Sequence, residues 1–488
     1  MPSCLDWCKD EFENGKEPVY RDEAGREYCV FHAPKGKKGM TLEEFNNRVF
    51  KRISYVINAE LLPRSHQSEA VKQRAIGHRT FCNLSDTVFE GDISFSRYNK
   101  NNPIPDISFD RATFNGEAYF TDAKFSGKAD FIGAEFRGKA DFIRATFNGE
   151  TYFIDAKFSG KTDFIGAEFR GKAYFIIAKF KGEANFYGVT FSREAYFTDA
   201  KFSEKANFDG AKFNEGARFC NKTDKIDKTF FKGADFRNFY AKEKVRLEGV
   251  NLKEVSFLDS DLRNIDFTNC EWQKQGGRDI LYDEVLLFGE KGRGISQKLK
   301  LWRSSFKQRD IGEIKKVEIL YRRLKQKYVD EHNWPEVSNW HYGEKEMLRK
   351  QTSWFELFFI EKKIFTLDFL NKIPKKLTYD LYWLSSGYGE MPVRAGITLG
   401  CLIFGISFFM YLSGFEPSPN APAWVKDLKD YHKLFVHILN TLQYITFLKE
   451  PIFKPASLFG EYLVLFSRIL IPIQTALFVL AIRNRFRR

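Results

Sequence analysis

Four side chains of metal-binding type stand near the N-terminus of this 488-residue chain. Cys4 and Cys8 are separated by three residues, and Cys29 and His32, 21 residues after Cys8, are separated by two. Three thiolates and one imidazole at such spacing can close a tetrahedral site, and zinc is its natural occupant in a segment too small for its own core. The sequence therefore predicts a structural zinc site, and the alternative is four unrelated buried side chains.

Side chains of catalytic type are otherwise scarce. The chain has seven histidines and shows no Gly-rich phosphate loop, nucleophile motif or carboxylate pair. His341, Tyr342 and Glu344 form a small cluster in the run WHYGEKEM, which we interpret as helix packing and solvated charge. We therefore expect a protein that is not an enzyme.

One charged residue interrupts a long apolar stretch near the C-terminus. Arg468 lies there, and Gln474 follows it one to two turns later. A charge deep in a bilayer costs about 2.5 to 3.5 kcal/mol on insertion scales. Arg468 is therefore expected to face a partner, a pore or another subunit, or else to extend to the nearby interface. Gln474 is expected to share its polar face.

The largest element that positions these groups is a phenylalanine ladder over residues 112–219, in which Phe recurs at alternating steps of six and five. An alanine stands two positions before almost every Phe, which gives the 11-residue unit A-x-F-x-G-x-A-x-F-x-x. Positions two apart on an extended segment point to the same side, so Ala and Phe face inward and the charged residues face water. The pattern predicts short strands joined by corners and wound into a tube whose Phe rings stack coil on coil.

The ladder continues on both sides. Repeat spacing is present from Leu84, and from Leu247 to Trp272 the step becomes a strict five. The units VNLKE, VSFLD, SDLRN and IDFTN resemble the pentapeptide-repeat family, whose unit is A(D/N)LXX. The resemblance covers residues 82–272 and implies a right-handed, four-sided β-helix. The extra residue of the 11-residue unit must be absorbed by a wider corner or a bulge, and the rod is expected to be about 40 Å long.

Helices are predicted on both sides of the rod. A capping box at Thr41 and Glu44 starts a helix over residues 42–58 that would cover the first coil. After the rod, helical spacing over residues 314–324 and a second helix after Pro335 predict a hairpin. Residues 354–370 are aromatic but carry five charges, which favours a helix at the membrane surface or one buried against the soluble domain.

Two stretches are long and apolar enough to cross a bilayer. Residues 395–412 are uncharged and cover about 27 to 30 Å of hydrocarbon. Residues 462–482 are long enough despite Arg468 and Pro472. Two spans place both termini on one side, and the basic flanks, ending in RNRFRR, make that side cytoplasmic. We expect a multi-pass protein of the cell (inner) membrane.

The net charge of +13 has the same origin. Acids and bases nearly balance across the ladder, and the excess lies in residues 291–376 and in the terminal arginines, beside the apolar segments. No nucleic-acid partner is therefore expected. DNA-mimicking pentapeptide-repeat proteins need acidic surfaces, which this ladder does not have. The scattered cysteines are typical of a reducing compartment.

Between the two spans, residues 434–448 form a shorter apolar stretch. The order span, short helix, break, span over about the last 90 residues is similar to the bacterial two-transmembrane ion-channel family, which implies a tetramer with residues 434–448 as pore helix. Where that family has a filter resembling TVGYG, this chain has LKEPIFKPAS, so potassium selectivity is not expected. The residues expected to line the mouth of a pore are Gln443, Thr446, Lys449, Glu450 and Lys454.

A GYG motif at residues 387–389 precedes the first span and cannot be the filter. Tyr388 and Arg394 are expected to anchor that span at the headgroups. The run SGYGEMPVR and the HYGEKEM segment resemble juxtamembrane segments of membrane-anchored pentapeptide-repeat proteins.

These features predict a non-enzymatic membrane protein that oligomerises through its spans and conducts ions without potassium selectivity. The alternative is a non-conducting, membrane-tethered scaffold whose β-helix binds a protein partner. The expected organisation is a zinc-site segment at 1–40, a helical cap at 41–81, the β-helix at 82–272, a helical hairpin at 273–352, amphipathic juxtamembrane helices at 353–392, and a two-span, channel-like domain at 393–488.

Overall fold

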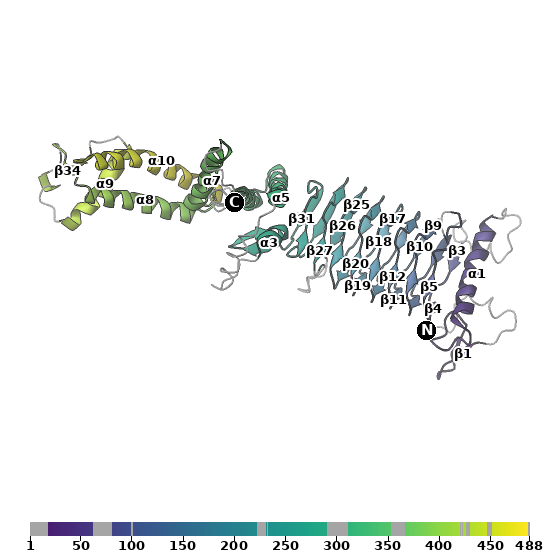
Figure 1. Ribbon diagram of the computed structural model, residues 1–488. Helices are drawn as coiled ribbons and strands as arrows, with labels where there is room; N and C mark the ends of the chain where they lie inside the picture. Colours follow the sequence, from purple (N-terminus) through teal and green to yellow (C-terminus); the bar gives the residue numbers. More distant parts are fainter. Residues whose placement is uncertain are drawn as a thin grey trace. The chain divides into compact units, whose positions relative to one another are not determined.

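The computed structural model describes residues 18–61, 81–98, 101–221, 231, 233–289, 311–352, 367–419, 421, 423–425, 430–446 and 451–486. They belong to two units, Met1–Lys307 and Gln308–Arg488, which we name the rod unit and the helical unit (Figure 1). Cys4, Cys8, Lys449 and Glu450 lie outside the described residues, as does most of the predicted surface helix at residues 354–370.

The rod unit is a four-sided β-solenoid whose strands, mostly two residues long, pair in parallel with the strands one coil away (Figure 1). Ala129 pairs with Thr151, and Phe136 pairs with Phe158, so one coil of the ladder takes 22 residues. In the strict five-residue repeats Val245 pairs with Ile265, which shortens the coil to 20 residues. Nine stacked strands at ~4.8 Å spacing give a length of about 38 Å, as the sequence predicts.

The four faces are numbered in the order in which the chain visits them. Face 1 contains β3 (Phe81–Asn83), β6 (Asp106–Ser108), β10 (Ala129–Asp130), β14 (Thr151–Tyr152), β18 (Ala173–Tyr174), β22 (Ala195–Tyr196), β26 (Ala217–Cys220), β29 (Val245–Glu248) and β31 (Ile265–Thr268). Face 2 contains β4 (Val88–Phe89), β7 (Thr113–Phe114), β11 (Glu135–Phe136), β15 (Lys157–Phe158), β19 (Lys179–Phe180) and β23 (Lys201–Phe202). Face 3 contains β5 (Ile93–Ser94), β8 (Ala118–Tyr119), β12 (Ala140–Asp141), β16 (Thr162–Asp163), β20 (Ala184–Asn185), β24 (Ala206–Asn207), β27 (Ala234–Asp235) and β30 (Val255–Ser256). Face 4 contains β9 (Lys124–Phe125), β13 (Thr146–Phe147), β17 (Glu168–Phe169), β21 (Thr190–Phe191), β25 (Lys212–Phe213) and β28 (Tyr240–Ala241).

The core of the rod is the predicted column of rings. Phe114 stacks on Phe136 at 4.6 Å between ring centres, and Phe136 stacks on Phe158 at 4.9 Å. The alanines of the ladder are buried with them. The inward orientation of Ala and Phe is therefore confirmed, and the small Ala leaves room for the rings of the neighbouring faces.

Two kinds of corner explain the alternation of five and six. The shorter corner has two residues, the second of which is left-handed, as in Asp122 with φ 57°. The longer corner has three residues, with Gly in the middle as far as Gly182 and Arg193, Glu204 and Glu215 in the later coils. At Gly138 a Cβ would lie 2.5 Å from the Gly116 carbonyl oxygen of the previous coil. Gly therefore allows the close approach of successive coils there, and the extra residue is absorbed without losing the four-sided register.

Both ends of the rod are covered. At the N-terminal end, α1 (Leu42–Leu61) begins with the predicted capping box and packs Phe45 against Phe89, with 5.9 Å between ring centres. Next to it lies the hairpin β1 (Tyr20–Arg21) and β2 (Glu27–Tyr28). At the other end, β32 (Gln273–Gln275), β33 (Arg278–Ile280) and α3 (Tyr282–Phe288) follow, and the buried Asp283 carboxylate accepts a hydrogen bond from the Phe257 N–H at 3.0 Å. These elements follow the last coil of the β-helix and belong to the same unit.

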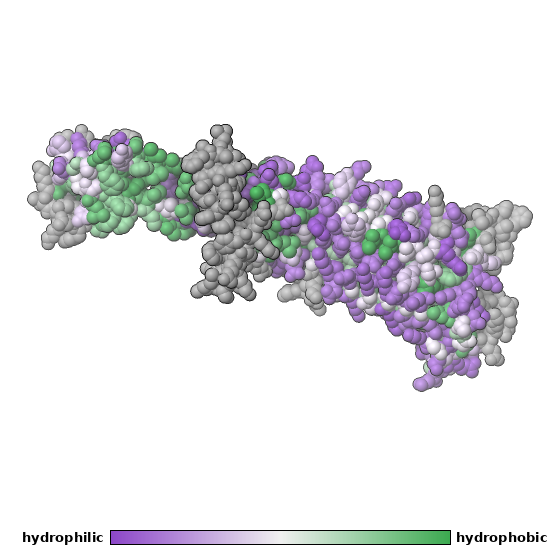
Figure 2. All heavy atoms as spheres, viewed as in Figure 1, coloured by the Kyte–Doolittle hydropathy of each residue, from purple (hydrophilic) through white to green (hydrophobic). Residues whose placement is uncertain are grey.

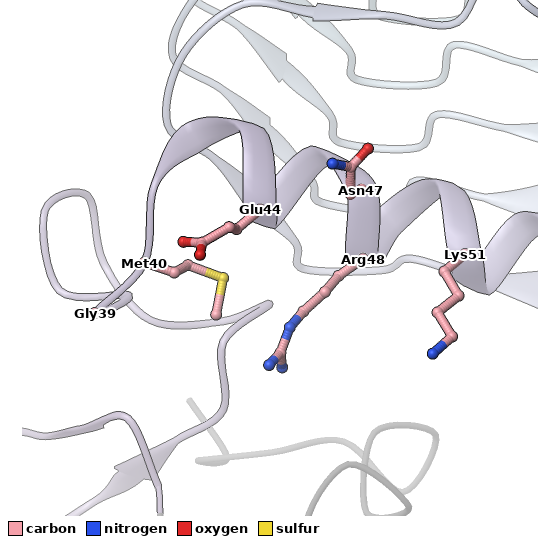
Figure 3. A pocket seen from close by; sticks show the side chains of 6 residues that line it. All are labelled: Gly39, Met40, Glu44, Asn47, Arg48 and Lys51. Atoms are coloured by element: carbon pink, nitrogen blue, oxygen red, sulfur yellow. The ribbon is translucent and has the colours of Figure 1, made fainter.

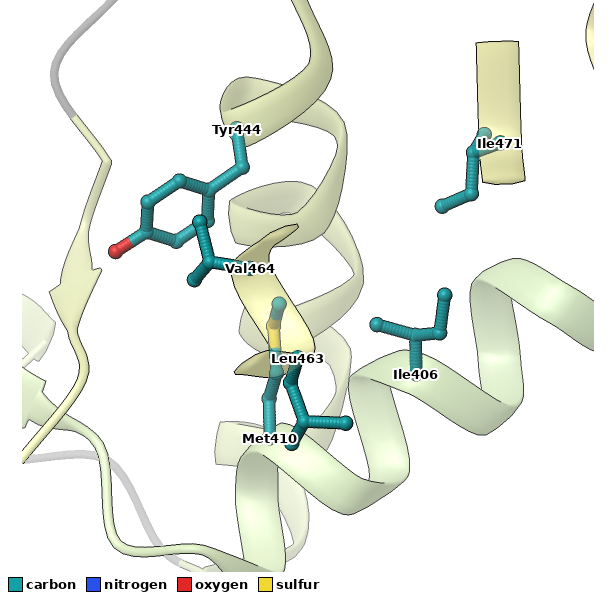
Figure 4. Close-up of a cluster of buried hydrophobic side chains, with 6 residues drawn as sticks. All are labelled: Ile406, Met410, Tyr444, Leu463, Val464 and Ile471. Atoms are coloured by element: carbon teal, nitrogen blue, oxygen red, sulfur yellow. The ribbon is translucent and has the colours of Figure 1, made fainter. Parts of the chain in front are cut away.

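The helical unit begins with the predicted hairpin, formed by α5 (Ile311–Asp330) and α6 (Trp334–Lys350). Then come α7 (Leu367–Ser386), α8 (Pro392–Leu412), β34 (Glu416–Pro417), the 3-10 turn η4 (Ala423–Val425), α9 (Asp430–Thr446), β35 (Phe453–Lys454) and α10 (Leu458–Phe486). The apolar core between α8, α9 and α10 contains Ile406, Met410, Tyr444, Leu463, Val464 and Ile471 (Figure 4).

Candidate functional site in the helical unit

Two helices of this unit, α8 and α10, are long and apolar enough to cross a membrane. Only 22% of the most apolar window of α8 and 28% of that of α10 is buried within the chain. Apolar residues accordingly dominate the face of these helices seen in Figure 2. A soluble core helix would bury most of such a surface, so α8 and α10 are candidate membrane spans.

The third apolar helix, α9, holds the chain segment that follows it. Asn440 is fully buried, donates to the Phe453 carbonyl at 3.2 Å and accepts from the Phe453 N–H at 2.9 Å. Tyr444 donates to the same carbonyl at 2.7 Å, and Gln443 accepts from the Ile452 N–H at 3.1 Å. These three side chains fix the backbone where it turns toward α10, and β35 pairs there with β34. We name this arrangement the α9 clamp.

One of the predicted pore-lining residues, Gln443, takes part in the clamp. The Gln443 carboxamide oxygen is bound to the backbone of Ile452 within the clamp. Lys454 is exposed on β35. The side chain of Thr446, together with Lys449 and Glu450, lies outside what the structure describes. Their role as pore-lining residues stays a prediction.

Arg468 on α10 lies at the C-terminal end of α9. Its Nε donates to the Tyr444 carbonyl oxygen at 3.3 Å, and its guanidinium carbon lies 5.7 Å from the centre of the Tyr444 ring. The last four carbonyls of a helix have no partner within it, and its C-terminus carries a partial negative charge. Arg468 therefore caps α9 within the same chain. A partner is one of the alternatives that the sequence predicts for Arg468, but the sequence does not identify it.

Gln474 does not share a polar face with Arg468, contrary to the prediction. It is buried, and its Nε2 donates to the Ser385 carbonyl at 3.0 Å and to the Ala395 carbonyl at 2.9 Å. Gln474 therefore ties α10 to the end of α7 and the start of α8, whereas Arg468 faces α9. Six residues correspond to about 600° of helical rotation, which places the two side chains about 120° apart.

The GYG segment forms the turn between α7 and α8. Gly387, Tyr388 and Gly389 have φ values of 55°, 61° and 77°, so three successive residues are left-handed. For Tyr388 this conformation is strained, and such strain persists only where the surroundings impose it. The sequence predicts that Tyr388 anchors the span at the headgroups. Its side chain is instead 1% exposed and is buried within the protein. Arg394 instead lies 5.1 Å from the ring centre of Trp383 and donates to the Trp383 carbonyl at 3.1 Å.

The HYGEKEM segment of α6, which resembles a juxtamembrane segment, contacts this turn. Tyr388 donates to the Glu346 carboxylate at 3.1 Å, which raises the pKa of the phenol together with its burial. Arg349 also binds Glu346, at 2.8 Å. On the other side, Asn484 of α10 donates to the Gly389 carbonyl at 3.0 Å. The turn therefore links the hairpin to both candidate spans.

The cluster at His341 and Glu344 serves the packing of the hairpin. Glu344 accepts from Arg322 of α5 at 3.4 Å and also from Lys325. Burial, with help from the charges of Lys345 and Lys325, lowers the pKa of His341 to about 4. These contacts agree with the interpretation of the cluster as helix packing, but the Glu344 carboxylate is buried and paired rather than solvated.

In the rod unit, the structure brings together two of the four predicted zinc ligands. The Cys29 Sγ lies 3.2 Å from the His32 Nδ1, and the His32 Nε2 lies 3.2 Å from the Ser85 carbonyl oxygen. Donation from Nε2 to the carbonyl leaves Nδ1 unprotonated and directed at the thiol, which is the arrangement of a metal-ligating histidine. Among the described residues no group of three or more potential ligands gathers, and Cys4 and Cys8 lie outside them, so zinc stays a prediction.

A surface cavity of about 500 Å³ lies along α1 (Figure 3). Glu44, one of its lining residues, is already bound to Thr41 through the capping box. The other lining residues are Gly39, Met40, Asn47, Arg48 and Lys51. The cavity is therefore a polar surface hollow beside the cap helix.

Comparison with protein families agrees with the geometry of the rod. Residues 109–157, 153–201 and 186–221 match the family of pentapeptide repeats. No curated protein and no solved structure matches the chain. The match lies within the rod unit and does not extend to the helical unit.

Several functional residues had no clear signal in the sequence. Asn440 and Tyr444 look like ordinary members of an apolar helix, although a buried Asn in such a helix is a usable sign of a polar contact. Asn484 stands in a basic terminal run and looks like part of a charged flank.

Proposed function

We propose that the helical unit inserts into a membrane through α8 and α10, assembles with other copies, and conducts ions without potassium selectivity. The observation that carries this proposal is the α9 clamp. Helix α9 has 17 residues and is about 26 Å long, whereas a helix that spans a bilayer usually has about 20 residues. It nevertheless packs between two helices of spanning length.

A helix that ends inside the apolar layer must satisfy its terminal carbonyls there. Arg468 supplies a donor to one of them, and Asn440, Gln443 and Tyr444 satisfy the backbone that follows. Irregular backbone at membrane depth is tolerated where it is buried in protein or lines an aqueous cavity. The clamp is therefore suited to hold a short re-entrant segment beside a pore axis formed by several copies, and four copies follow from the channel resemblance.

The orientation belongs to the same proposal. The basic C-terminal run and the rod unit lie on the cytoplasmic side of the cell membrane, and both termini are there. Accessibility of single cysteines to a membrane-impermeant maleimide, with exposed Cys401 changed to Ser, tests this in spheroplasts. A cysteine placed at Arg137 of the rod should be protected from outside, and labelling there would contradict the orientation.

Assembly is tested by the number of copies in detergent. Arg468→Leu removes both the cap of α9 and the cation, whereas Arg468→Lys keeps a donor. We expect four copies for the wild type and for Arg468→Lys, and a loss of the tetramer for Arg468→Leu. A tetramer unchanged by Arg468→Leu would mean that the residue does not support the assembly, and a wild-type monomer would contradict the proposal.

A second function is favoured by the rod. A non-conducting scaffold tethered by α8 and α10 would use a rod face to bind protein, and face 1 carries a column of half-buried, stacked tyrosine side chains suited to that. Tight rod-dependent association in a chain that shows no ion flux would favour this alternative.

A further inference from the structure

Face 1 of the rod carries a column of outward tyrosines. Tyr152 stacks on Tyr174 at 4.8 Å between ring centres, and Tyr174 stacks on Tyr196 at 5.1 Å. At the equivalent position on face 3, Tyr119 is followed by Asp or Asn in the next five coils, and Asp141 there accepts the Ile143 N–H at 3.0 Å, which stabilises the corner. Three coils of face 1 thus lack this corner bond and present an aromatic surface instead.

An aliphatic column runs beside the tyrosines. Ile132, Ile154 and Ile176 occupy the first corner position after the strands of three successive coils, and each is half-buried. Ile177, the next residue, is 40% exposed. The two columns make a contiguous patch of tyrosine and isoleucine, which is the composition of protein interfaces rather than of an ordinary charged rod surface.

A third column, on the other side of the tyrosines, is charged and alternates in sign. The parallel registers of face 1 align its members one per coil. In order along the rod they are Asp106, Lys128, Glu150, Lys172, Glu194 and Gly216.

We propose that face 1 binds face 1 of a second copy of this chain, with the two rods antiparallel. The twofold axis runs along the strand direction, between the coil of Tyr152 and the coil of Tyr174. Each column then faces the same column in reverse order. Tyr152 lies opposite the partner's Tyr174, and Ile154 lies opposite the partner's Ile176.

The charges support this register. Lys128 comes opposite the partner's Glu194, and Glu150 comes opposite the partner's Lys172. An axis passing through a coil instead would place Lys172 opposite the partner's Lys172. Like charges across an interface cost several kcal/mol, so the alternation selects an axis between coils. In this register the remaining Tyr196 lies opposite the partner's Asp130, and the remaining Ile132 lies opposite the partner's Thr198.

The ends of the patch are complementary as well. Gly216 interrupts the charged column and opens a notch of about 210 Å³ beside Tyr196 and Arg218. The Arg218 guanidinium lies 5.7 Å from the Tyr196 ring centre. In the proposed register this notch receives the partner's Asp106, while the partner's Asp110 lies on the other side of Arg218. The basic lining residues Arg218, Lys244 and Arg246 outnumber the acidic Glu194 and Glu215, so the partner's Asp106 meets a mainly basic end at both limits of the interface.

The charges of the column also pair within one chain, as in Lys172 with Glu194 at 3.1 Å, where the side chains are 40% and 38% exposed. Exposed pairs of this kind contribute about 0 to 1 kcal/mol, so they exchange partners readily when a second surface approaches. Six coils of ~4.8 Å and a face of about five residues, at most about 16 Å wide at ~3.3 Å per residue, give about 460 Å² per copy, which is the size of a weak, transient interface.

The test is cross-linking of the full-length chain in detergent, in a Cys401→Ser background. Lys128→Cys protein is mixed with Glu194→Cys protein that carries a different tag, and disulfides are formed under mild oxidation. We expect cross-links between the two variants to exceed those of either variant with itself by at least about tenfold, because residues 128 and 128 of the two copies are about 14 Å apart along the rods. A preference of Lys128→Cys for itself would show a different register or arrangement of the rods and would overturn the proposal.

A charge exchange then separates pairing between copies from pairing within one chain. Glu150→Lys alone and Lys172→Glu alone each create two like-charge contacts and should lower the cross-linking yield about tenfold. The double variant Glu150→Lys with Lys172→Glu restores both contacts between copies but leaves the Lys172–Glu194 pair of one chain broken. Recovery of the yield supports the proposal. If the yield does not recover, or if neither single variant changes it, face 1 does not bind a second copy in this way and the proposal is wrong.

Discussion

The carboxamide of Asn440 makes two hydrogen bonds to a single residue, donating to the Phe453 carbonyl at 3.2 Å and accepting from its N–H at 2.9 Å. A side chain that satisfies both backbone groups of one residue adds to the pairing of the two-residue strand β35 with β34 and fixes that segment. The connection between α9 and α10 is therefore held at a defined place.

Asn440→Leu should destabilise the helical unit by about 1 to 3 kcal/mol, because the buried Phe453 N–H loses its acceptor. Tyr444 still donates to the carbonyl, so the loss is partial. The midpoint of thermal unfolding in detergent measures this. Leu439→Ala, one residue away and 53% exposed, is the matched control and should have little effect. Equal stabilities of Asn440→Leu and Leu439→Ala would contradict the account of the clamp.

Gly138→Ala should destabilise the rod by about 1 to 3 kcal/mol, because the added methyl would lie 2.5 Å from a backbone oxygen of Gly116 that cannot move cheaply. Arg137→Ala, at the neighbouring exposed position, should change stability by less than about 0.5 kcal/mol. Unfolding followed by the circular dichroism of the β-structure compares them. A neutral Gly138→Ala would show that the coils are less closely stacked than described.

His341 should make the helical unit less stable in mild acid. Its pKa falls from 6.5 to about 4 on folding, chiefly through burial. Between these values the unfolded chain binds a proton that the folded chain does not, so stability declines as pH falls from about 6.5 toward 4. Urea unfolding of the wild type and of His341→Gln at pH 7.5 and 4.5 tests the difference. The variant should lose less stability between the two values, and an identical loss would rule out this role.

The zinc prediction rests on Cys29 and His32, which the structure places in contact. Purified protein should contain about one zinc per chain. Cys29→Ser should lower the zinc content several-fold, while Cys270→Ser, in the rod, should leave it unchanged. Metal analysis after dialysis measures both, and a zinc content insensitive to Cys29→Ser would reject the site.

The fold of the rod was accessible from the sequence because each repeat obeys a local rule. The inward orientation of Phe136 and Ala140 follows from their spacing alone, and stacking repeats the same contacts in every coil. The candidate spans were accessible in the same way, since length and hydropathy are local properties.

The contacts of the helical unit were less accessible, because they depend on which helices meet. Tyr388 is a residue of the type that often anchors helices at a membrane interface, yet the turn buries it against Glu346. Arg468 finds its partner 24 residues earlier in the chain, at a carbonyl that only the end of α9 exposes. Both contacts are tertiary, so the periodicity of the sequence does not predict them.

The proposal that this unit conducts ions is tested most directly by planar-bilayer recording of the purified full-length chain. We predict discrete conductance steps that do not favour potassium over sodium and that Asn440→Leu lowers or abolishes, while Leu439→Ala leaves them intact. Silence of the correctly inserted, tetrameric wild type across a range of salts and voltages would contradict the central claim and leave the tethered scaffold as the function.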